Sequence, residues 1–386
     1  MPNNTLEKKF ALWQHKKLKR LRPVMSDRTH GDNRIVINGQ SCINFSSNDY
    51  LGLIQHPAIT ASMLEGIKKY GVGSGASAMV SGYFTMQNKL EQEFAQWLKV
   101  DSAILFNSGY MANLGIMASL LSRQDKVLSD KLCHASLMDG IQLSRAKHYR
   151  YRHNDMAALQ RIAVQHKPDM IVTESIFSMY GDITPIADII KIADQYEAGL
   201  IIDDAHGIGI LGQTGRGIIE HYDLNQNQFS CIVLPLGKAF NGMGAMVAGS
   251  SETIETILQF SKSYRYSTAL PPAMAYALQS ALNIIQTESW RRHALNNNID
   301  FFNAKAIQKN LRLISVERTP IRVMRIGDNQ KVLDLQKFLW NEGLFVAAIR
   351  PPTVPYDNAC VRISLNCLHT TEDIECLLAK IRERLS

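Results

Sequence analysis

The sequence predicts an α/β fold with a mostly parallel central sheet, followed by a smaller α+β domain. Short apolar runs alternate with longer amphipathic stretches through the middle of the chain, and this alternation is typical of a parallel sheet covered by helices on both faces. Residues 186–196 (IADIIKIADQY) have apolar positions three and four apart, which predicts one such helix. Strands are predicted at 103–106, 126–129, 170–173, 200–203, 231–234 and 245–248.

The pattern changes after the proline pair at 271–272. The elements predicted beyond it are a long helix over about 274–298, a strand at 321–325, a helix at 332–341, strands near 345–349 and 361–365, and a last helix from 371. We therefore expect a large domain over 45–272, a small C-terminal domain over 273–386, and an N-terminal segment over 1–44 that packs near the small domain.

Composition narrows the class of protein. The 386 residues are 46% apolar and 20% charged, which excludes disorder for most of the chain because enough apolar surface is present to offset the ordering entropy. The 42 basic and 35 acidic residues give a net charge of +7 at pH 7. This excess is compatible with a nucleic acid, a membrane surface, an anionic small molecule or an acidic protein as the partner.

The chain shows no export or membrane signal. Residues 1–24 lack the apolar core of a secretory signal, and no apolar run approaches the ~18 residues of a membrane span. We therefore expect a cytoplasmic protein. Six scattered cysteines, without a CxxC pair or metal-ligand spacing, are typical of thiols in a reducing compartment and predict no metal site: Cys42, Cys133, Cys231, Cys360, Cys367 and Cys376.

Polar side chains follow two of the predicted strands. The strand at 200–203 leads into Asp203, Asp204 and His206, at the sheet edge where open α/β folds bind ligands. Taken alone, the tetrapeptide 203–206 (DDAH) is as compatible with a helix-capping aspartate plus a loop histidine as with a ligand site. Lys238 follows the strand at 231–234 among small residues. A lone lysine is usually a solvated charge, but burial near other groups lowers a lysine pKa and makes the amine a nucleophile for carbonyls.

Other segments offer phosphate-binding and ring-stacking groups. FNSGYMAN (106–113) combines a strand, a glycine turn and a helix start, whose backbone N–H groups form an anion site. Ser267 and Thr268 could hold a phosphate oxygen or cap a helix, and His134, taken alone, favours a capping or core role. The glycines of GVGSGAS (71–77) do not follow a strand, which excludes a dinucleotide-binding fingerprint.

Together these residues are the parts of a pyridoxal 5'-phosphate (PLP) site. The turn binds the phosphate, an imidazole stacks on the ring, an aspartate keeps the ring nitrogen protonated, and a lysine forms the Schiff base and then moves a proton. Each part alone is weak, whereas the set predicts one cofactor.

Long motifs extend this set over nearly the whole chain. With them the sequence resembles the α-oxoamine synthases, PLP-dependent transferases of the aspartate aminotransferase fold (fold type I) that join an amino acid to an acyl thioester with loss of CO2. The motifs are NFSSNDYLGL (44–53), GVGSGAS, FNSGYMAN, HASL (134–137), TESIFSMYGDITPI (173–186), DDAHGIGILGQTGRG (203–217), LGKAF (236–240), YSTALPP (266–272) and AIRPPTVP (348–355).

The motif at 348–355 is the most specific of these. It indicates the branch of the family that condenses L-alanine with pimeloyl-CoA or a pimeloyl-carrier protein in biotin biosynthesis, and the resemblance implies a homodimer with shared active sites. Another branch, glycine C-acetyltransferase or a long-chain acyl autoinducer-type synthase, is the alternative. A nucleic-acid-binding protein is a remote one, because the sequence lacks an aromatic-interleaved basic platform. It is suggested only by a basic cluster of Lys16, Lys17, Lys19, Arg20 and Arg22.

The resemblance implies a role for each residue around the ring. Lys238 would form the Schiff base, Asp203 would face the ring nitrogen and His206 the ring hydroxyl. His134 would stack on the ring face and contact substrate, and Ser178 would lie near the ring substituents. Of these, Lys238, His134 and Asp203 are the expected catalytic residues.

The resemblance also implies the residues that bind phosphate and substrate. Arg362 would clamp the amino-acid carboxylate through two hydrogen bonds, a geometry that arginine suits. Thr353 and an N-terminal arginine, Arg20 or Arg22, would contact the acyl substrate, and Asn48 would also bind substrate. Phosphate would be held by the backbone of two residues and by two residues of a second subunit: Gly109 and Tyr110, and Ser267 and Thr268.

Three positions depart from the family pattern. The threonine usual three residues before the lysine is Pro235, which has no hydroxyl to donate and is expected to weaken phosphate binding. The frequent Gly-Ser-Gly-His is 76–79 (ASAM), which affects the expected acyl channel, and a usual histidine is Gln87.

Overall fold

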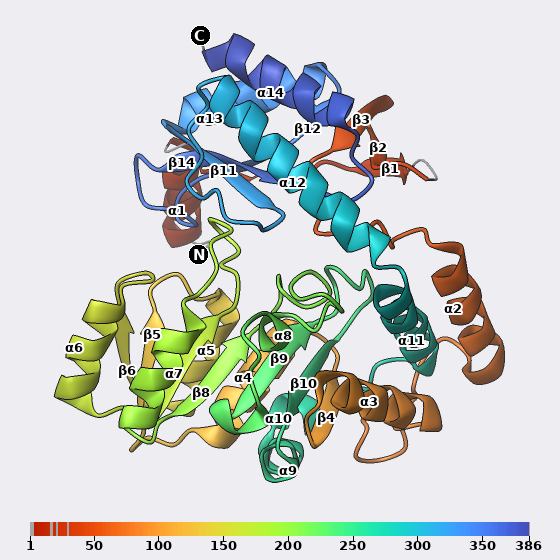
Figure 1. The fold of residues 1–386 in the computed structure, drawn as a ribbon, viewed down its shortest axis with the longest axis vertical. Helices are drawn as coiled ribbons and strands as arrows, with labels where there is room; N and C mark the ends of the chain where they lie inside the picture. The colour runs from red at the N-terminus through yellow and green to blue at the C-terminus, as the bar shows by residue number, and fades with distance from the viewer. Residues whose placement is uncertain (1–3, 16–17, 21, 29–30, 386) are drawn as a thin grey trace. The chain divides into compact units, whose positions relative to one another are not determined.

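The computed structural model describes residues 4–15, 18–20, 22–28 and 31–385, and divides into two compact units (Figure 1). The larger unit comprises Asn48–Ser178 and Asp182–Arg292, and the smaller unit comprises Met1–Ser47, Met179–Gly181 and His293–Ser386. The boundary expected at 272–273 falls at the start of helix α11, whereas the units divide inside helix α12.

A seven-stranded sheet forms the centre of the larger unit. Its order is β4-β10-β9-β8-β7-β5-β6, and all neighbours are parallel except those of β10, which is antiparallel to β4 and to β9. The prediction of a mostly parallel sheet is therefore confirmed. The strands are β4 (Ser102–Phe106), β5 (Lys126–Asp130), β6 (Lys147–Tyr151), β7 (Met170–Glu174), β8 (Gly199–Asp203), β9 (Cys231–Pro235) and β10 (Ala245–Gly249).

All six predicted strands of this sheet are present, and strand β6 is additional. Its sequence, KHYRY, lacks the apolar run that marks the buried strands, because it lies at the sheet edge and pairs only with β5. In β10, Ala245 pairs with Phe106 of β4 on one side and with Pro235 of β9 on the other.

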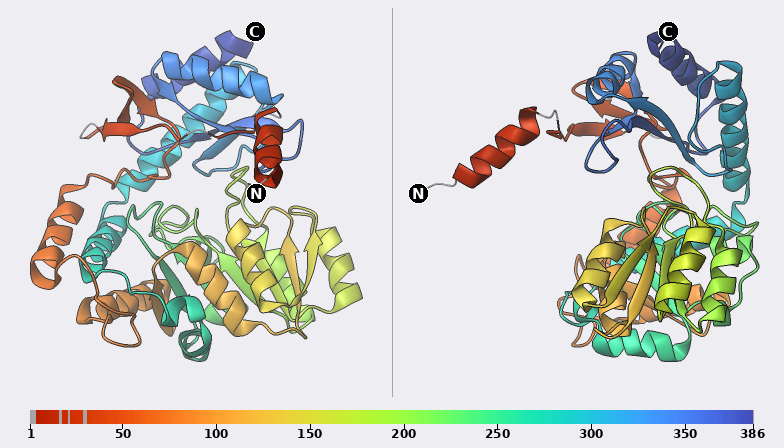
Figure 2. Two further views of the ribbon diagram at one scale, coloured as in Figure 1. Left: turned by 180° about the vertical axis from the view of Figure 1, so that it is seen from behind. Right: turned by 90° about the vertical axis from the view of Figure 1, so that its left-hand side faces the viewer.

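Helices lie on both faces of the sheet, as the opposite views of Figures 1 and 2 show. Helix α4 packs against β4, β9 and β10, and α7 packs against β8. Fully buried side chains of α4 and of the strands, such as Ile116, Val172 and Ile201, share one hydrophobic core. The helices are α2 (Pro57–Tyr70), α3 (Thr85–Leu98), α4 (Gly109–Leu120), α5 (Ala135–Ser144), α6 (Met156–His166), α7 (Ile186–Gln195), α8 (Ile218–His221), α9 (Ser251–Phe260), α10 (Lys262–Arg265), α11 (Pro272–Thr287) and the 3-10 helix η1 (Gln226–Gln228).

The single long helix predicted over about 274–298 is wrong. Two helices cover this stretch, α11 and α12 (Trp290–Gln308), and the chain leaves the helical conformation at Glu288 (φ −100°, ψ 62°). The Glu288 carboxylate accepts from Arg291 Nε at 2.8 Å and from Trp290 Nε1 at 3.2 Å. These contacts hold the start of α12, and no proline or glycine marks the break in the sequence.

The smaller unit contains two sheets of orders β1-β2-β3-β12 and β11-β14-β13. Strand β3 pairs in parallel with β12, so N-terminal and C-terminal residues share a sheet. Its strands are β1 (Met25–Arg28), β2 (Arg34–Ile37), β3 (Gln40–Asn44), β11 (Ile321–Gly327), β12 (Leu344–Phe345), β13 (Ala347–Ile349) and β14 (Ala359–Ser364). Its helices are α1 (Asn4–His15), α13 (Asn329–Asn341) and α14 (Thr371–Leu385), with most of α12.

Within the part of the chain that the structure describes, no helix combines the length and the apolar character needed to cross a bilayer.

Candidate active site

The predicted ring-binding residues gather at one edge of the seven-stranded sheet. His134 follows β5, Asp203 is the last residue of β8, and Lys238 follows β9. Strand β4 runs in the same direction as β9, because both are antiparallel to β10, so the turn at Gly109 lies at the same edge. This edge, at the carboxyl ends of the parallel strands, is where open α/β sheets bind ligands.

Asp203 is a buried carboxylate with a fixed orientation. Its Oδ2 accepts from Asn113 Nδ2 at 2.8 Å, and its Oδ1 accepts from the backbone N–H of Ala205 at 3.1 Å. A carboxylate held in this way by two donors presents a buried negative charge that suits a protonated ring nitrogen.

The adjacent Asp204 has a different role. Its Oδ2 accepts from the backbone N–H of Ile218 at 3.0 Å, and burial raises the pKa of this carboxyl to about 7. Gly217 has a φ of +69°, and a Cβ added there would lie 1.8 Å from Asp204 Oδ2, so only glycine fits. Asp204 therefore closes the loop between β8 and α8, and Asp203 is the member of the pair left at the sheet edge.

Glu174 lies beside Asp203 in the candidate site, and the sequence analysis missed it. It ends β7 and pairs in register with Asp203 across the β7–β8 ladder. Burial, and then the charge of Asp203, raise the pKa of Glu174 to about 8, although hydrogen bonds from the backbone of His134 and Ser178 and the charge of Lys238 oppose the shift. Glu174 is therefore mostly a neutral acid at pH 7. The sequence does contain a signal for it, because Glu174, like Asp203, is an acidic residue at the end of an apolar strand.

His134 and Lys238 belong to the same electrostatic environment. Loss of solvent around the ring lowers the pKa of His134; the Asp203 carboxylate opposes this, and the Lys238 ammonium lowers the pKa further. His134 is therefore neutral at pH 7. Lys238 is half-buried, in the turn between β9 and β10.

Asn48 and His206 are joined by a residue that the sequence analysis did not single out. The Tyr50 hydroxyl donates to Asn48 Oδ1 at 3.0 Å. The oxygen of this hydroxyl lies 2.7 Å from His206 Nδ1. Tyr50 is fully buried. Its hydroxyl therefore fixes the His206 ring relative to Asn48.

The glycine turn after β4 has the geometry of an anion site. Ser108 caps α4, its side chain accepting from the backbone N–H of Met111 at 3.2 Å, so the N–H groups of Gly109 and Tyr110 lie in the first helical turn. A Cβ added to Gly109 would lie 2.7 Å from Pro235 Cγ. Pro235 therefore packs directly against this turn and requires a glycine there.

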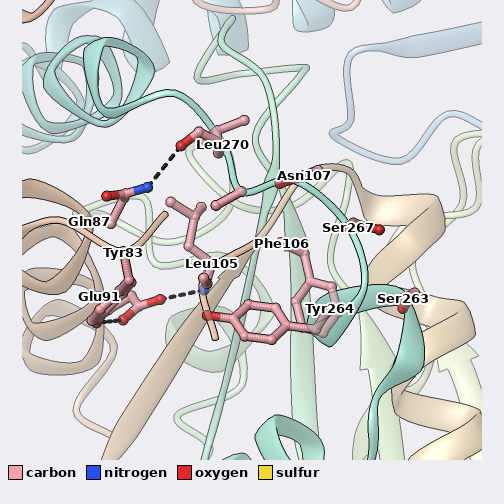
Figure 3. A pocket seen from close by; sticks show the side chains of 12 residues that line it. Tyr83, Gln87, Glu91, Leu105, Phe106, Asn107, Ser263, Tyr264, Ser267 and Leu270 are labelled. Carbon is pink, nitrogen blue, oxygen red and sulfur yellow. Dashed lines mark hydrogen bonds between the residues drawn. The ribbon is translucent and has the colours of Figure 1, made fainter. Parts of the chain in front are cut away.

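Ser267 and Thr268 lie beside this turn in their own chain. The Asn107 side chain donates to the carbonyl oxygen of Thr268. The backbone of Thr268 also forms an isolated antiparallel β-bridge with Ser77. Ser267 and Asn107 also line a cavity of about 10 Å³ (Figure 3). The assignment of Ser267 and Thr268 to the phosphate of a second subunit remains a prediction.

Gln87, one of the departures from the family pattern, has its hydrogen bonds satisfied at this cavity. Its side chain accepts from the backbone N–H of Phe84 at 2.7 Å and donates to the carbonyl of Gly82 at 3.1 Å. It also donates to the carbonyl of Leu270 at 2.8 Å, the bond drawn in Figure 3. Gln87 thus ties helix α3 to the segment that carries Ser267.

Ser178 is half-buried on the loop between β7 and α7. The loop is fastened by His153, whose Nδ1 lies 3.0 Å from Asp130 Oδ1 and whose Nε2 lies 2.7 Å from Asp182 Oδ2. Burial alone would lower the pKa of His153, but the hydrogen bonds to Asp130 and Asp182 outweigh it and raise the pKa to about 9.

This clamp, the pairing of His153 with Asp130 and Asp182, predicts that the stability of the fold depends on pH. The pKa of His153 rises from ~6.5 in the unfolded chain, so its contribution is complete below pH ~6.5 and is lost as the pH rises through the folded value of about 9. Urea unfolding of His153→Gln should show a deficit in unfolding free energy that is larger at pH 6 than at pH 10. The matched control is His166→Gln, whose ring stacks on Tyr149. An equal deficit at both pH values would contradict the clamp.

Two predicted acyl-binding residues meet in the smaller unit. Arg20 Nη2 donates to Thr353 Oγ1 at 2.7 Å, so Arg20, of the two candidate arginines, is the one in contact with Thr353. Arg350, which was not predicted, is buried next to them, and its Nη2 donates to the carbonyl of Lys19 at 3.2 Å. Burial, and then the charge of Arg20, lower the pKa of Arg350. Two guanidinium groups so close together favour an anionic ligand.

The remaining predicted positions in the smaller unit have simple environments. Arg362 is half-buried on β14, where its Nη1 donates to Ser364 Oγ at 3.1 Å. Arg22 is exposed. Lys16 and Lys17, part of the basic cluster, lie outside the described residues.

Comparison with known proteins agrees with this geometry. Residues 40–381 match the family model of class I and II aminotransferases. The chain is 43% identical to the 8-amino-7-oxononanoate synthase of Thioalkalivibrio sulfidiphilus, over 89% of this chain and 88% of the relative. It is 40% identical to that of Stutzerimonas stutzeri, over 98% and 96%. The chain belongs to the 8-amino-7-oxononanoate synthase family.

Solved structures of the family and its neighbours have the same fold. The crystal structure of 8-amino-7-oxononanoate synthase from Francisella tularensis is 35% identical, with a TM-score of 0.81 over 89% of this chain and 98% of that one. Serine palmitoyltransferase from S. paucimobilis, solved with a bound PLP–myriocin aldimine, is 26% identical, with a TM-score of 0.93 over 99% and 98%. The resemblance and the fold predicted from the sequence are therefore confirmed.

Pyridoxal phosphate is the cofactor of this family, and the residues present fit it. A buried carboxylate with a fixed orientation suits the ring nitrogen, and a half-buried lysine follows the adjacent strand β9. A helix N-terminus that begins with glycine leaves room for the phosphate to approach the backbone.

Pro235→Thr, which restores the residue usual in the family, is expected to tighten cofactor binding. The position packs against Gly109, so a hydroxyl there would add one donor to the phosphate, and a hydrogen bond to a charged group is worth about 1.5–3 kcal/mol. Titration of the apoprotein with PLP should show a dissociation constant about tenfold lower or better. Gly109→Ala should weaken binding, since its Cβ would overlap Pro235. An unchanged constant for Pro235→Thr would show that the proline does not limit phosphate binding.

Proposed function

We propose that this protein condenses L-alanine with a pimeloyl thioester to form 8-amino-7-oxononanoate, CO2 and the free thiol, as a step of biotin biosynthesis. The observation that carries the proposal is the joint placement of Lys238, Asp203 and His134 at one sheet edge, in a chain whose relatives are named 8-amino-7-oxononanoate synthase. A nucleophilic amine, a buried carboxylate and a neutral imidazole are the groups that carbanion chemistry on an amino acid requires.

Each residue has a defined task in this reaction. Bound PLP supplies an electron sink for the electron pair left on the alanine Cα. Lys238 would hold the cofactor, and its amine, when free, would remove the Cα proton. Asp203 keeps the proton on the ring nitrogen, because its buried negative charge stabilises the cationic form. Arg362 holds the alanine carboxylate through its guanidinium fork.

The acyl transfer needs a donor at the thioester oxygen. We assign this to His134, which is neutral and offers an N–H to the charge that develops when the Cα carbanion attacks the carbonyl. The C–S bond then breaks, and the thiolate leaves and takes up a proton from solvent. The resulting β-keto acid loses CO2, and return of a proton to Cα releases the amino-ketone.

The acyl substrate carries a second carboxylate at its far end, and the arginine pair of the smaller unit suits it. Arg20 and Arg350 offer two cationic groups, and Thr353 offers a hydroxyl. We propose that these three residues recognise the pimeloyl chain, with Asn48 also contributing to substrate binding.

A thiol-release assay tests the function. Purified protein with PLP, L-alanine and pimeloyl-CoA should release CoA and form 8-amino-7-oxononanoate, detected by mass spectrometry. Glycine with acetyl-CoA and alanine with long-chain acyl-CoA should react at least tenfold more slowly. Faster turnover of either pair would assign the protein to another branch of the α-oxoamine synthases.

We also propose a homodimer in the cytoplasm. Val72, Val80 and Tyr266 are 83%, 80% and 73% exposed, and their segments are joined by the bridge between Ser77 and Thr268. So much exposed apolar surface beside the predicted phosphate residues supports a second copy as its cover. Light scattering should give twice the 43.3 kDa mass of the chain, and a monomer mass would contradict the proposal.

All six cysteines are free thiols, which supports a reducing compartment such as the cytoplasm.

A further inference from the structure

Two residues without an assigned role connect Asp203 to His134. Asn113 Nδ2, on helix α4, donates to Asp203 Oδ2 at 2.8 Å and to Ser136 Oγ at 2.9 Å. Ser136 Oγ in turn lies 2.7 Å from His134 Nδ1. Asn113 and Ser136 are 1% and 0% exposed, so water does not compete for these bonds.

The donor and acceptor of every bond in this series follow from chemistry. The backbone N–H of Ser136 points at His134 Nδ1 from 3.3 Å, and an N–H can only donate, so Nδ1 is an acceptor. The Ser136 oxygen accepts from Asn113, which leaves its hydroxyl proton for Nδ1. The series therefore runs in one direction, from Asn113 to Ser136 to His134, while the second Asn113 N–H is directed at Asp203.

Asn113 also shows an unpaired atom that a purely structural asparagine rarely has. Its Oδ1 is buried and has no hydrogen-bond partner among the described residues. An unsatisfied buried acceptor costs free energy, so the amide is oriented by its two N–H donors and not by its oxygen.

We propose that Asn113 and Ser136 are positioning residues that fix His134 as the neutral tautomer with its proton on Nε2, and fix Asp203 through the same amide. Because two donors occupy Nδ1, the Nε2–H is the group available to a developing oxyanion. The catalytic consequence rests on the proposed function, whereas the tautomer is a property of the protein itself. Three ionisable groups act on His134: Asp203, Lys238 and Asp139.

The test is the protonation of the two His134 ring nitrogens in the holoenzyme without substrate. Protein labelled with ring-15N histidine is examined by long-range proton–nitrogen correlation, and the His134 signals are identified by their absence in His134→Gln. We expect Nδ1 to have the chemical shift of an unprotonated nitrogen and Nε2 that of a protonated one. A protonated Nδ1 in the wild type would overturn the proposal.

Two variants and one matched control sharpen the test. Ser136→Ala should move the two His134 nitrogen shifts toward each other as the tautomers mix, and should lower kcat about tenfold. Asn113→Ala should shift the same signals and lower kcat similarly. Ser129→Ala removes a Ser–His hydrogen bond of the same kind, to His148 at 2.8 Å, and should leave the His134 signals and kcat unchanged. Unchanged His134 shifts in both Ser136→Ala and Asn113→Ala would overturn the assignment, whether or not the condensation activity is found.

Discussion

Lys238→Ala is expected to abolish turnover and the visible absorbance of the lysine-bound cofactor. Of the described side chains that we place at this sheet edge, Asp203, Glu174 and His134 cannot replace the amine, because a carboxyl group or an imidazole does not form a Schiff base with an aldehyde. The loss in kcat should reach about ten-thousandfold or more, the upper end of the range for removal of a catalytic acid–base group. The protein should still fold, since the side chain is only half-buried.

The matched control for this experiment is Lys131→Ala, an exposed lysine after strand β5. It should keep the wild-type absorbance and rate. Retained absorbance and activity in Lys238→Ala would remove the lysine from the mechanism. Loss of both in Lys131→Ala would show that the assay reports on folding.

Asp203→Asn is expected to keep the fold and lose most of the carbanion chemistry. The amide oxygen can still accept from Asn113 or Ala205, so the local structure should survive. The negative charge is lost, however, and a neutral amide no longer keeps the ring nitrogen protonated. Exchange of the alanine Cα proton with deuterated solvent, followed by NMR, should slow by about a hundredfold or more.

The neighbouring Asp204→Asn is an unusually close control, because the two residues are adjacent. Asp204 closes the loop to α8, and because burial raises its pKa to about 7 the folded state favours its neutral form, so the neutral amide variant should keep most of its stability in urea and most of the exchange rate. A native exchange rate in Asp203→Asn would contradict the role assigned to that carboxylate. A larger catalytic loss in Asp204→Asn than in Asp203→Asn would exchange the two roles.

The sequence was informative wherever local pattern and local chemistry coincide. Apolar strands that end in Asp203 or lead into Lys238 predicted both the sheet and the edge at which the candidate site lies. Glu174 ends its strand in the same way but was overlooked. Helix α11 ends without glycine or proline, because the Glu288 side chain and not the backbone alone defines the break.

Other residues could only be found in three dimensions. Tyr50 reaches His206 across 156 positions of sequence, and Arg350 reaches Lys19 across 331. Asn113 lies in a helix of small and apolar residues, and the sequence around it does not show what its amide binds. The hydrogen bonds to Asp203 and Ser136 appear only in the folded structure. Contacts of this kind depend on packing between elements, and periodicity does not report them.

The antiparallel strand β10 has a mechanical consequence for the cofactor. Ala245 is paired on one side with Phe106, which precedes the phosphate turn, and on the other with Pro235, which precedes Lys238. The two predicted anchor points of the cofactor, the turn at Gly109 and Lys238, therefore follow strands that lie two strand spacings apart, ~10 Å in all, and the backbone ladders set this span. A one-residue slip of β10 would shift its pairing with β4 and with β9 at once. This strand therefore sets the distance between the two predicted anchor points.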